Sequence, residues 1–320
     1  MKKATMIWLI VAVALIVAGA SVFVTAMSLI RWDFNMLSTV KYVTNEHIVD
    51  KEFSDIYIYT DVSKITFIPS SEDEVRVVSK EAENMQHTVA VNDGTLEIKL
   101  SDTRKWYDHI TLFQLEIPVI TVYIPAGKYG SLKILTSTGD ISVQNQFEFA
   151  SADIKGSTAD VTYCAKTEGD IIIHCSTGDI KLKDISASSI DLKASTGKIE
   201  LANVNTGDIN IEVTTGKTVV TGVKCNNLIS TGDTGKINLA DVVANGKFSI
   251  KRDTGDVTIE ACDAAEVYIK TSTGDVKGTF LTNKVISAET STGRLDYPKL
   301  TEGGKCEIKT STGDIKIFIK

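Results

Sequence analysis

The chain has 320 residues, of which 43% are apolar and 7% aromatic, and its formal net charge is −7. That length and apolar content are ample for a large core. The mild acidity argues against a nucleic-acid partner, because no basic domain offsets the repulsion of phosphates. The prominence of Val, Ile, Thr and Gly in a chain so poor in aromatic residues favours β-structure.

An uncharged stretch, Ala4–Ile30, lies near the amino terminus. It is long enough to cross a bilayer as a tilted helix. Lys2 and Lys3 precede it and Arg31 follows, so we expect the amino end inside the cell and the rest outside. The alternative is a signal peptide cleaved after Ala18-Gly19-Ala20. Because the apolar run continues well beyond that site, we favour an uncleaved, single-pass anchor in the cell membrane.

Residues 53–125 alternate between apolar and polar residues in several runs, which predicts β-strands. Asn92-Asp93-Gly94 separates two of these runs and predicts a hairpin turn. We expect this region to cap the first coil of the repeats that follow and to cover its edge. The predicted division of the chain is a membrane segment over 1–30, a juxtamembrane spacer over 31–50, a β cap over 51–130 and β-solenoid repeats over 131–320.

A Thr-Gly pair recurs at intervals of 19 or 20 residues through the second half of the chain, apart from one beat at which Ala159 replaces the glycine. The glycines are Gly139, Gly178, Gly197, Gly216, Gly235, Gly255, Gly274, Gly293 and Gly313. A fixed period of this length is typical of a solenoid, in which each repeat forms one coil stacked on the last. Glycine suits a corner, because it permits positive φ and close backbone approach.

Aligning the repeats on the glycine gives columns of apolar residues on both sides of it. They lie seven and five positions before the glycine, as at Ile190 and Leu192, and two and four positions after it, as at Ile199 and Leu201. A shorter column lies seven positions after it, from Ile185 to Leu300. Three inward-facing segments per coil predict an all-β parallel β-helix of about ten coils with a roughly triangular section.

The order of these motifs resembles a known family. A membrane segment is followed by "FSDIYIYTDVSKITFIPSSEDEVRVV", "VNDGTLEIKL", "ITVYIPAGKYGSLKILTSTGDISV" and then repeated "STGDI" units. The chain from Phe53 to Lys320 is similar to the bacterial "putative adhesin" family, whose members carry a domain of unknown function. The resemblance implies a surface β-solenoid linked to envelope maintenance or stress. It supplies no catalytic residues.

The position after the glycine column is charged in every coil, and Asp140, Asp160 and Asp179 stand in consecutive coils. Three stacked carboxylates could hold Ca²⁺. A solvated corner is the favoured interpretation, with cross-coil pairs such as Asp275–Arg294. We expect no metal and no cofactor. The five cysteines, Cys164, Cys175, Cys225, Cys262 and Cys306, show no zinc spacing, and buried free thiols are favoured over a Cys164–Cys175 disulfide.

Residues 101–118 combine aromatic and charged residues. Trp106, Tyr107, His109 and Phe113 are the candidates for a ligand-contacting loop, and the alternative is a hairpin packed on the cap. We expect a non-enzymatic binding or structural module at the bacterial envelope, with a surface polysaccharide or an envelope protein as partner. The alternative is a carbohydrate-active β-helix enzyme. It would need two carboxylates across a groove, whereas coils of nearly constant length leave little room for groove-forming loops.

Overall fold

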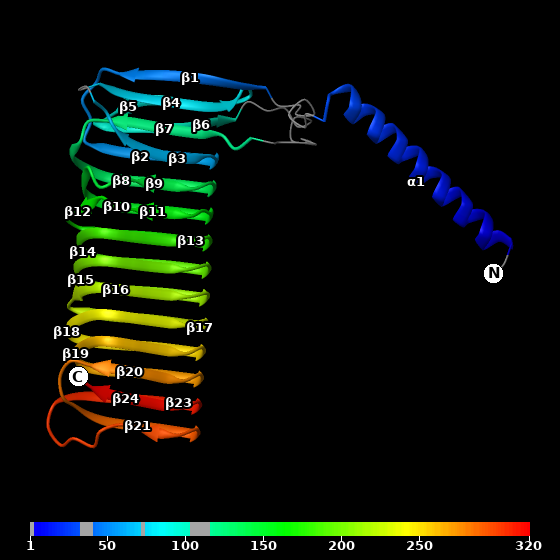
Figure 1. Cartoon of the computed structure of the whole chain (residues 1–320). Helices are drawn as coiled ribbons and strands as arrows, with labels where there is room; N and C mark the ends of the chain where they lie inside the picture. The colour runs from blue at the N-terminus through cyan, green and yellow to red at the C-terminus, as the bar shows by residue number, and fades with distance from the viewer. Residues whose placement is uncertain (1–2, 33–40, 72–73, 103–115) are drawn as a thin grey trace.

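The structure is a computed structural model that describes residues 3–32, 41–71, 74–102 and 116–320. It contains one helix, α1 (Lys3–Leu29), and a stack of strands that forms a rod (Figure 1). Within α1, the segment Thr5–Leu29 has a mean hydropathy of 2.8 and is long and apolar enough to cross a membrane. A charge-free segment is needed for this, because charged side chains are costly in lipid.

The rod is a parallel β-solenoid with an amino-terminal β cap, which confirms the predicted fold. The cap region contains β1 (Tyr42–Val49), β2 (Asp55–Val62), β3 (Lys64–Pro69), β4 (Val75–Ala82), β5 (Met85–Asn92), β6 (Thr95–Asp102) and β7 (Val119–Ile124). The repeats contain β8 (Gly127–Thr138), β9 (Ile141–Val143), β10 (Phe147–Thr158), β11 (Val161–Tyr163), β12 (Lys166–Thr167), β13 (Asp170–Thr177), β14 (Ile180–Thr196), β15 (Ile199–Thr215), β16 (Thr218–Cys225), β17 (Asn227–Thr234), β18 (Ile237–Thr254), β19 (Val257–Thr273), β20 (Val276–Phe280), β21 (Lys284–Thr292), β22 (Leu295–Asp296), β23 (Gly304–Thr312) and β24 (Ile315–Ile319).

The predicted apolar columns form one continuous core along the rod. Ile190, Leu192, Ile199 and Leu201 are all buried, as are their counterparts in the other inner coils. The third column is also buried from Ile185 to Cys262. The prediction of Leu281 as the next member of this column is wrong, because Phe280 lies opposite Cys262. Each coil is too thin to bury these residues alone, so stability comes from stacking on its neighbours.

The glycine of each Thr-Gly beat forms a corner that a larger residue could not form. Gly197 has φ +150°, and a Cβ added to it would lie 2.0 Å from the carbonyl oxygen of Gly178 in the preceding coil. Its N–H donates a hydrogen bond to the carbonyl of Thr215 in the following coil. A second left-handed corner lies six residues after the glycine, at Asp184, Asn203, Gly222, Asp241 and Ala261, with φ between +49° and +63°. Aspartate and asparagine tolerate this conformation better than other side chains.

The last two coils do not stack in chain order. β23 pairs in parallel with β19 on one side and with β21 on the other, and β24 lies likewise between β20 and β22. After β20 the chain skips one level, forms the outermost coil with β21 and β22, and returns through residues 297–303 to fill the gap (Figure 1). The expectation that each coil stacks on the one before it in sequence is wrong for this pair.

The amino-terminal end is interleaved in a similar way. β2 lies between β6 and β8, and β3 lies between β7 and β9. Residues 55–69 therefore form a coil of their own, and the chain leaves it to build the cap before returning to the next level at β8. β1, β4 and β7 pair antiparallel, and β5 and β6 form the predicted hairpin. Asp93 and Gly94 at its turn have positive φ, as a two-residue turn of this kind requires.

The guanidinium of Arg252 lies inside the rod. Arg252 is 2% exposed, and its guanidinium donates to the carbonyl of Val213 at 2.9 Å and to Oγ1 of Thr218 at 2.8 Å. Gly232 leaves the space for it, since a Cβ there would lie 1.6 Å from Nη1 of Arg252. Burial lowers the pKa of Arg252 to about 10, which leaves it charged at neutral pH.

Candidate functional site

The predicted ligand-contacting residues Trp106, Tyr107, His109 and Phe113 lie in 103–115, outside the residues that the structure describes. The described residues next to this segment belong to the cap. Glu116 is held there by Lys80, at 2.5 Å, and its carbonyl accepts a hydrogen bond from Tyr42. Of the described residues on either side, Asp102 ends β6 and Glu116 contacts β1 and β4.

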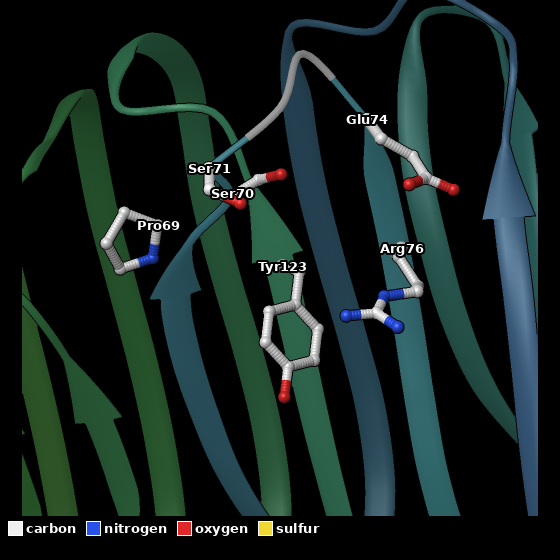
Figure 2. Close-up of a pocket in the computed structure, with 6 residues that line it drawn as sticks. All are labelled: Pro69, Ser70, Ser71, Glu74, Arg76 and Tyr123. Carbon is white, nitrogen blue, oxygen red and sulfur yellow. The ribbon is translucent and has the colours of Figure 1, made fainter.

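A shallow hollow of about 360 Å³ opens on the side of the cap (Figure 2). Ser70, Ser71 and Glu74 line it together with Pro69 and the two residues at its centre, Arg76 and Tyr123. The guanidinium of Arg76 stacks on the Tyr123 ring, 4.6 Å from its centroid, and Nη1 pairs with Glu46 at 2.9 Å. The hydrogen bond that Arg76 donates to Glu46 raises the pKa of Arg76. The hollow therefore offers hydroxyls, a ring and an already paired cation, which suits weak polar contacts.

A second hollow, of about 570 Å³, lies between β1, β5 and the end of β6. Its lining includes His47, Gln86, His87, Thr88 and Ser101. Ser101 immediately precedes Asp102, the last residue that the structure describes before the predicted ligand-contacting segment.

A buried polar network lies beneath the second hollow. The Glu81 carboxylate contacts Nδ1 of His87 at 2.5 Å and accepts hydrogen bonds from Ser79 and Asn45 at 3.0 and 2.8 Å. Nε2 of His87 contacts Oγ1 of Thr60 at 2.9 Å. Burial alone would raise the pKa of Glu81, but the hydrogen bonds from His87 and Asn45 outweigh it and lower the pKa. The carboxylate is therefore ionised at neutral pH and ties β1, β4 and β5 together.

The order Thr60–His87–Glu81 resembles the hydroxyl, imidazole and carboxylate of a hydrolase. Thr60 is only 2% exposed, and its hydroxyl donates to Ser63, which is itself buried. A nucleophile must be accessible to a substrate, and the Thr60 hydroxyl is not. The cluster therefore stabilises the packing of the cap strands. Sequence reasoning missed it, although a signal was present. Ser79 and Glu81 continue the inward-facing positions that begin at Val77 in β4.

The carboxylates of the charged column hold neighbouring coils together. Oδ1 of Asp160 accepts the N–H of Asp179, and Oδ1 of Asp179 accepts the N–H of Lys198, each at 2.7 Å. Among the described residues, no group of three His, Cys, Asp or Glu side chains is arranged to hold a metal ion. The predicted Asp275–Arg294 pair is wrong, because Asp314 of the interleaved coil lies between these two residues and bonds to each.

The five cysteines are free thiols, so the alternative Cys164–Cys175 disulfide is contradicted. His174 bonds to Asp191 on the outer surface at 2.7 Å, whereas Cys175 is buried. The two residues therefore point to opposite faces of the strand and do not form a nucleophile and its base.

The chain is therefore a β-solenoid protein with a β cap at one end and a helix that is long and apolar enough to cross a membrane. The chain belongs to the Toastrack DUF4097 family, whose model matches residues 53–317. A comparison with curated proteins gave no match. This membership confirms the family resemblance drawn from the sequence motifs.

Solved bacterial structures are similar to this chain at low identity. One, described as a "putative adhesin" from Bacteroides fragilis NCTC 9343, shares 15% identity with a TM-score of 0.39, covering 87% of this chain and 97% of that one. Another "putative adhesin", from Parabacteroides distasonis ATCC 8503, shares 11% with a TM-score of 0.41, over 87% and 98% of the two chains. A "putative lipid binding protein" from the same organism shares 13% with a TM-score of 0.32, over 88% and 98%.

Proposed function

We propose that this chain is a non-enzymatic binding or structural module, anchored in the bacterial cell membrane by α1 and exposed at the cell surface. The observation that carries the proposal is the regularity of the rod. Its inner coils use their outward side chains in repeated cross-coil bonds, such as Asn203 to Asp184 and Asn210 to Asp191. A rigid rod of this kind separates its two ends, and the departures from regularity lie at those ends.

The anchor assigns a direction to the rod. Leu29 ends α1 and Tyr42 begins β1, so the cap lies within ~45 Å of the end of the helix even if the intervening chain is fully extended. The cap then faces the membrane, and the coil of β21 and β22 projects away from it. A surface polysaccharide or an envelope protein would meet the sides of the cap or the distal end.

Two measurements test this proposal together: the membrane topology of the chain, and whether it releases sugars from cell envelopes. Asn210→Cys, in a Cys164→Ser background, places an exposed thiol on the rod, and Lys3→Cys places one at the start of α1. A membrane-impermeant maleimide should label Asn210→Cys on intact cells and Lys3→Cys only after lysis. Loss of an amino-terminal tag during export would show cleavage and contradict the anchor. The purified full chain should be retained on isolated cell envelopes without releasing sugars, and sugar release would support the enzyme alternative.

A further inference from the structure

The distal end of the rod is an open sheet edge. β21 pairs with β23 on one side, and β22 pairs with β24; among the described strands neither has a partner on the other side. The core is open there too. Ile286 and Ala288 are only partly buried and Leu295 is 45% exposed, whereas Cys306, Ile308 and Ile315 at the same positions one level inward are fully buried. At the other end, the antiparallel cap covers the stack.

β21 lacks several of the features that usually prevent an exposed edge from pairing. It contains no proline, and its pairing with β23 has no bulge. Its one lysine, Lys284, is 2% exposed and is turned back into the rod, where Nζ contacts Asp263 and donates to the carbonyl of Ala264 at 2.8 Å. Val285, 39% exposed, and Glu289 remain on its outer face.

The distal coil is self-complementary. Residues 284–303 carry three basic side chains (Lys284, Arg294, Lys299) and three acidic ones (Glu289, Asp296, Glu302), a sum of zero in a chain of net charge −7. Two copies of β21 related by a two-fold axis at Ser287 would run antiparallel. In that register Ile286 faces Ala288 of the copy on the core side, and Val285 faces Glu289 on the outer side. Apolar residues meet, and no like charges stand opposite each other.

We propose that the distal edge formed by β21 and β22 binds a second copy of this chain, end to end. The two β21 strands pair antiparallel around Ser287, and the two cores join into one. The contact is isologous, so it closes at two copies and does not extend into fibres. Backbone pairing at the edge is combined with burial of the exposed apolar positions, as in other strand-addition interfaces.

This geometry has a consequence for anchored chains. A two-fold axis across the rod places the two amino termini at opposite ends of the dimer. Membrane-anchored copies would therefore pair between two facing membranes. Pairing between facing membranes would identify a second copy of the chain as the partner in the proposed surface role, and it depends on that role. Pairing of the purified chain in solution does not depend on it.

The test uses the full chain with Cys164→Ser. Mild oxidation should join Ser287→Cys into a disulfide dimer, and Asn210→Cys, on the side of the rod, should remain monomeric. Light scattering in detergent should show a dimer that Val285→Glu weakens at least tenfold, because it places two carboxylates opposite each other. Adding Glu289→Lys should restore pairing. Liposomes carrying the full chain should cluster with the same pattern among variants.

Several outcomes would overturn the proposal. One is a chain that stays monomeric at about 100 μM, and another is equal cross-linking at positions 287 and 210. A third is a Val285→Glu defect that Glu289→Lys does not rescue, with circular dichroism showing that both variants are folded. A different strand captured at this edge, with no self-pairing, would also contradict a homotypic contact. Dimers in detergent without liposome clustering would retain the interface and count against the facing-membrane role.

Discussion

At the scale of single residues, the buried guanidinium of Arg252 shows how a charge is accommodated inside the rod. The side chain of Arg252 extends past Gly232, its neighbour in the preceding coil, to bond with Val213 and Thr218. Gly232 leaves room for it because it has no side chain. In the sequence, Thr218 interrupts an apolar column, whereas Gly232 lies outside the predicted columns, and nothing links the two. The structure makes them parts of one buried site, because a guanidinium in a core must keep its hydrogen bonds.

Gly232→Ala should destabilise the chain by ~3 kcal/mol, because its Cβ would lie 1.9 Å from the carbonyl oxygen of Val213, which is backbone and cannot turn away. Chemical denaturation of the full chain in detergent, followed by circular dichroism, measures the change. Gly127→Ala is the matched control, since no atom lies within 4 Å of its added Cβ. A Gly232→Ala variant as stable as the control would contradict the placement of Arg252.

The cysteines should differ sharply in reactivity. Burial raises the pKa of Cys175 and Cys262 to about 11 and that of Cys225 and Cys306 to about 12, whereas Cys164 is only partly buried. The thiolate is the reactive form. N-Ethylmaleimide at pH 8 should therefore modify Cys164 first, and mass spectrometry should find five modifications only after denaturation. Rapid labelling of the folded Cys164→Ser variant would show that a buried cysteine is accessible.

At the scale of elements, the two ends of the rod differ in kind from its middle. The inner coils repeat one pattern, while each end contains a coil that is out of chain order. In the cap, the Glu81–His87 pair joins strands that have no repeat to align them. At the distal end, Lys284 of β21 reaches past β23 to Asp263 and the carbonyl of Ala264, near the middle of β19. Each contact joins strands at an end of the rod where the repeat pattern does not determine their pairing.

The Glu81–His87 pair predicts how the stability of the cap depends on pH. The pKa of Glu81 is lowered below its ordinary value of 4.5 in the folded chain. Its contribution is therefore present above pH ~4.5 and is lost as the pH falls through the folded-state pKa. His87→Leu should cost about 3–5 kcal/mol at pH 7, because it leaves a buried carboxylate without its partner. Hydrogen exchange across β4 and β5 measures both effects. Protection that does not weaken as the pH falls below ~4.5 would contradict the first effect, and a His87→Leu variant as stable as the parent at pH 7 would contradict the second.

Interleaving predicts an unusual response to truncation. Removing residues 297–320 deletes β23 and β24, which are the described partners of β21 and β22. Residues 284–296 should then lose their protection from hydrogen exchange, while β19 keeps most of its own through β18. Stacking in chain order would instead leave 284–296 packed on β19 and β20 and protected. The measurement thus distinguishes the two orders of coils directly.

At the scale of the whole molecule, the apolar columns form one continuous core. A destabilising substitution in one coil should therefore also destabilise the coils stacked on it. Ile199→Asp places a charge at a fully buried position in the middle of the rod. We expect it to unfold the adjacent coils and to reduce the strand signal in circular dichroism. Lys198→Ala should be nearly silent, because the bond from this position to Asp179 uses its backbone N–H. Similar losses in both variants would contradict the column assignment.

Most of the solenoid could be predicted from the sequence, because its causes are local and repeated. The Thr-Gly spacing sets the corners, and the columns through Ile199 and Leu201 define which face is buried. The candidate site was less predictable. The Glu81 network depends on which cap strands meet, and the predicted segment with Trp106 lies outside the described residues.

The sequence by itself determined the period, the glycine corners, the apolar columns and the membrane-capable helix, since each follows from steric and hydrophobic requirements within one repeat. Only the tertiary structure decided the order in which the coils stack. Nearly equivalent coils offer the same columns, so local pattern cannot tell β23 from β21 as the neighbour of β19. The connection over residues 297–303 and the reach of Lys284 back to Asp263 favour one arrangement, and that arrangement determines which strand forms the exposed end.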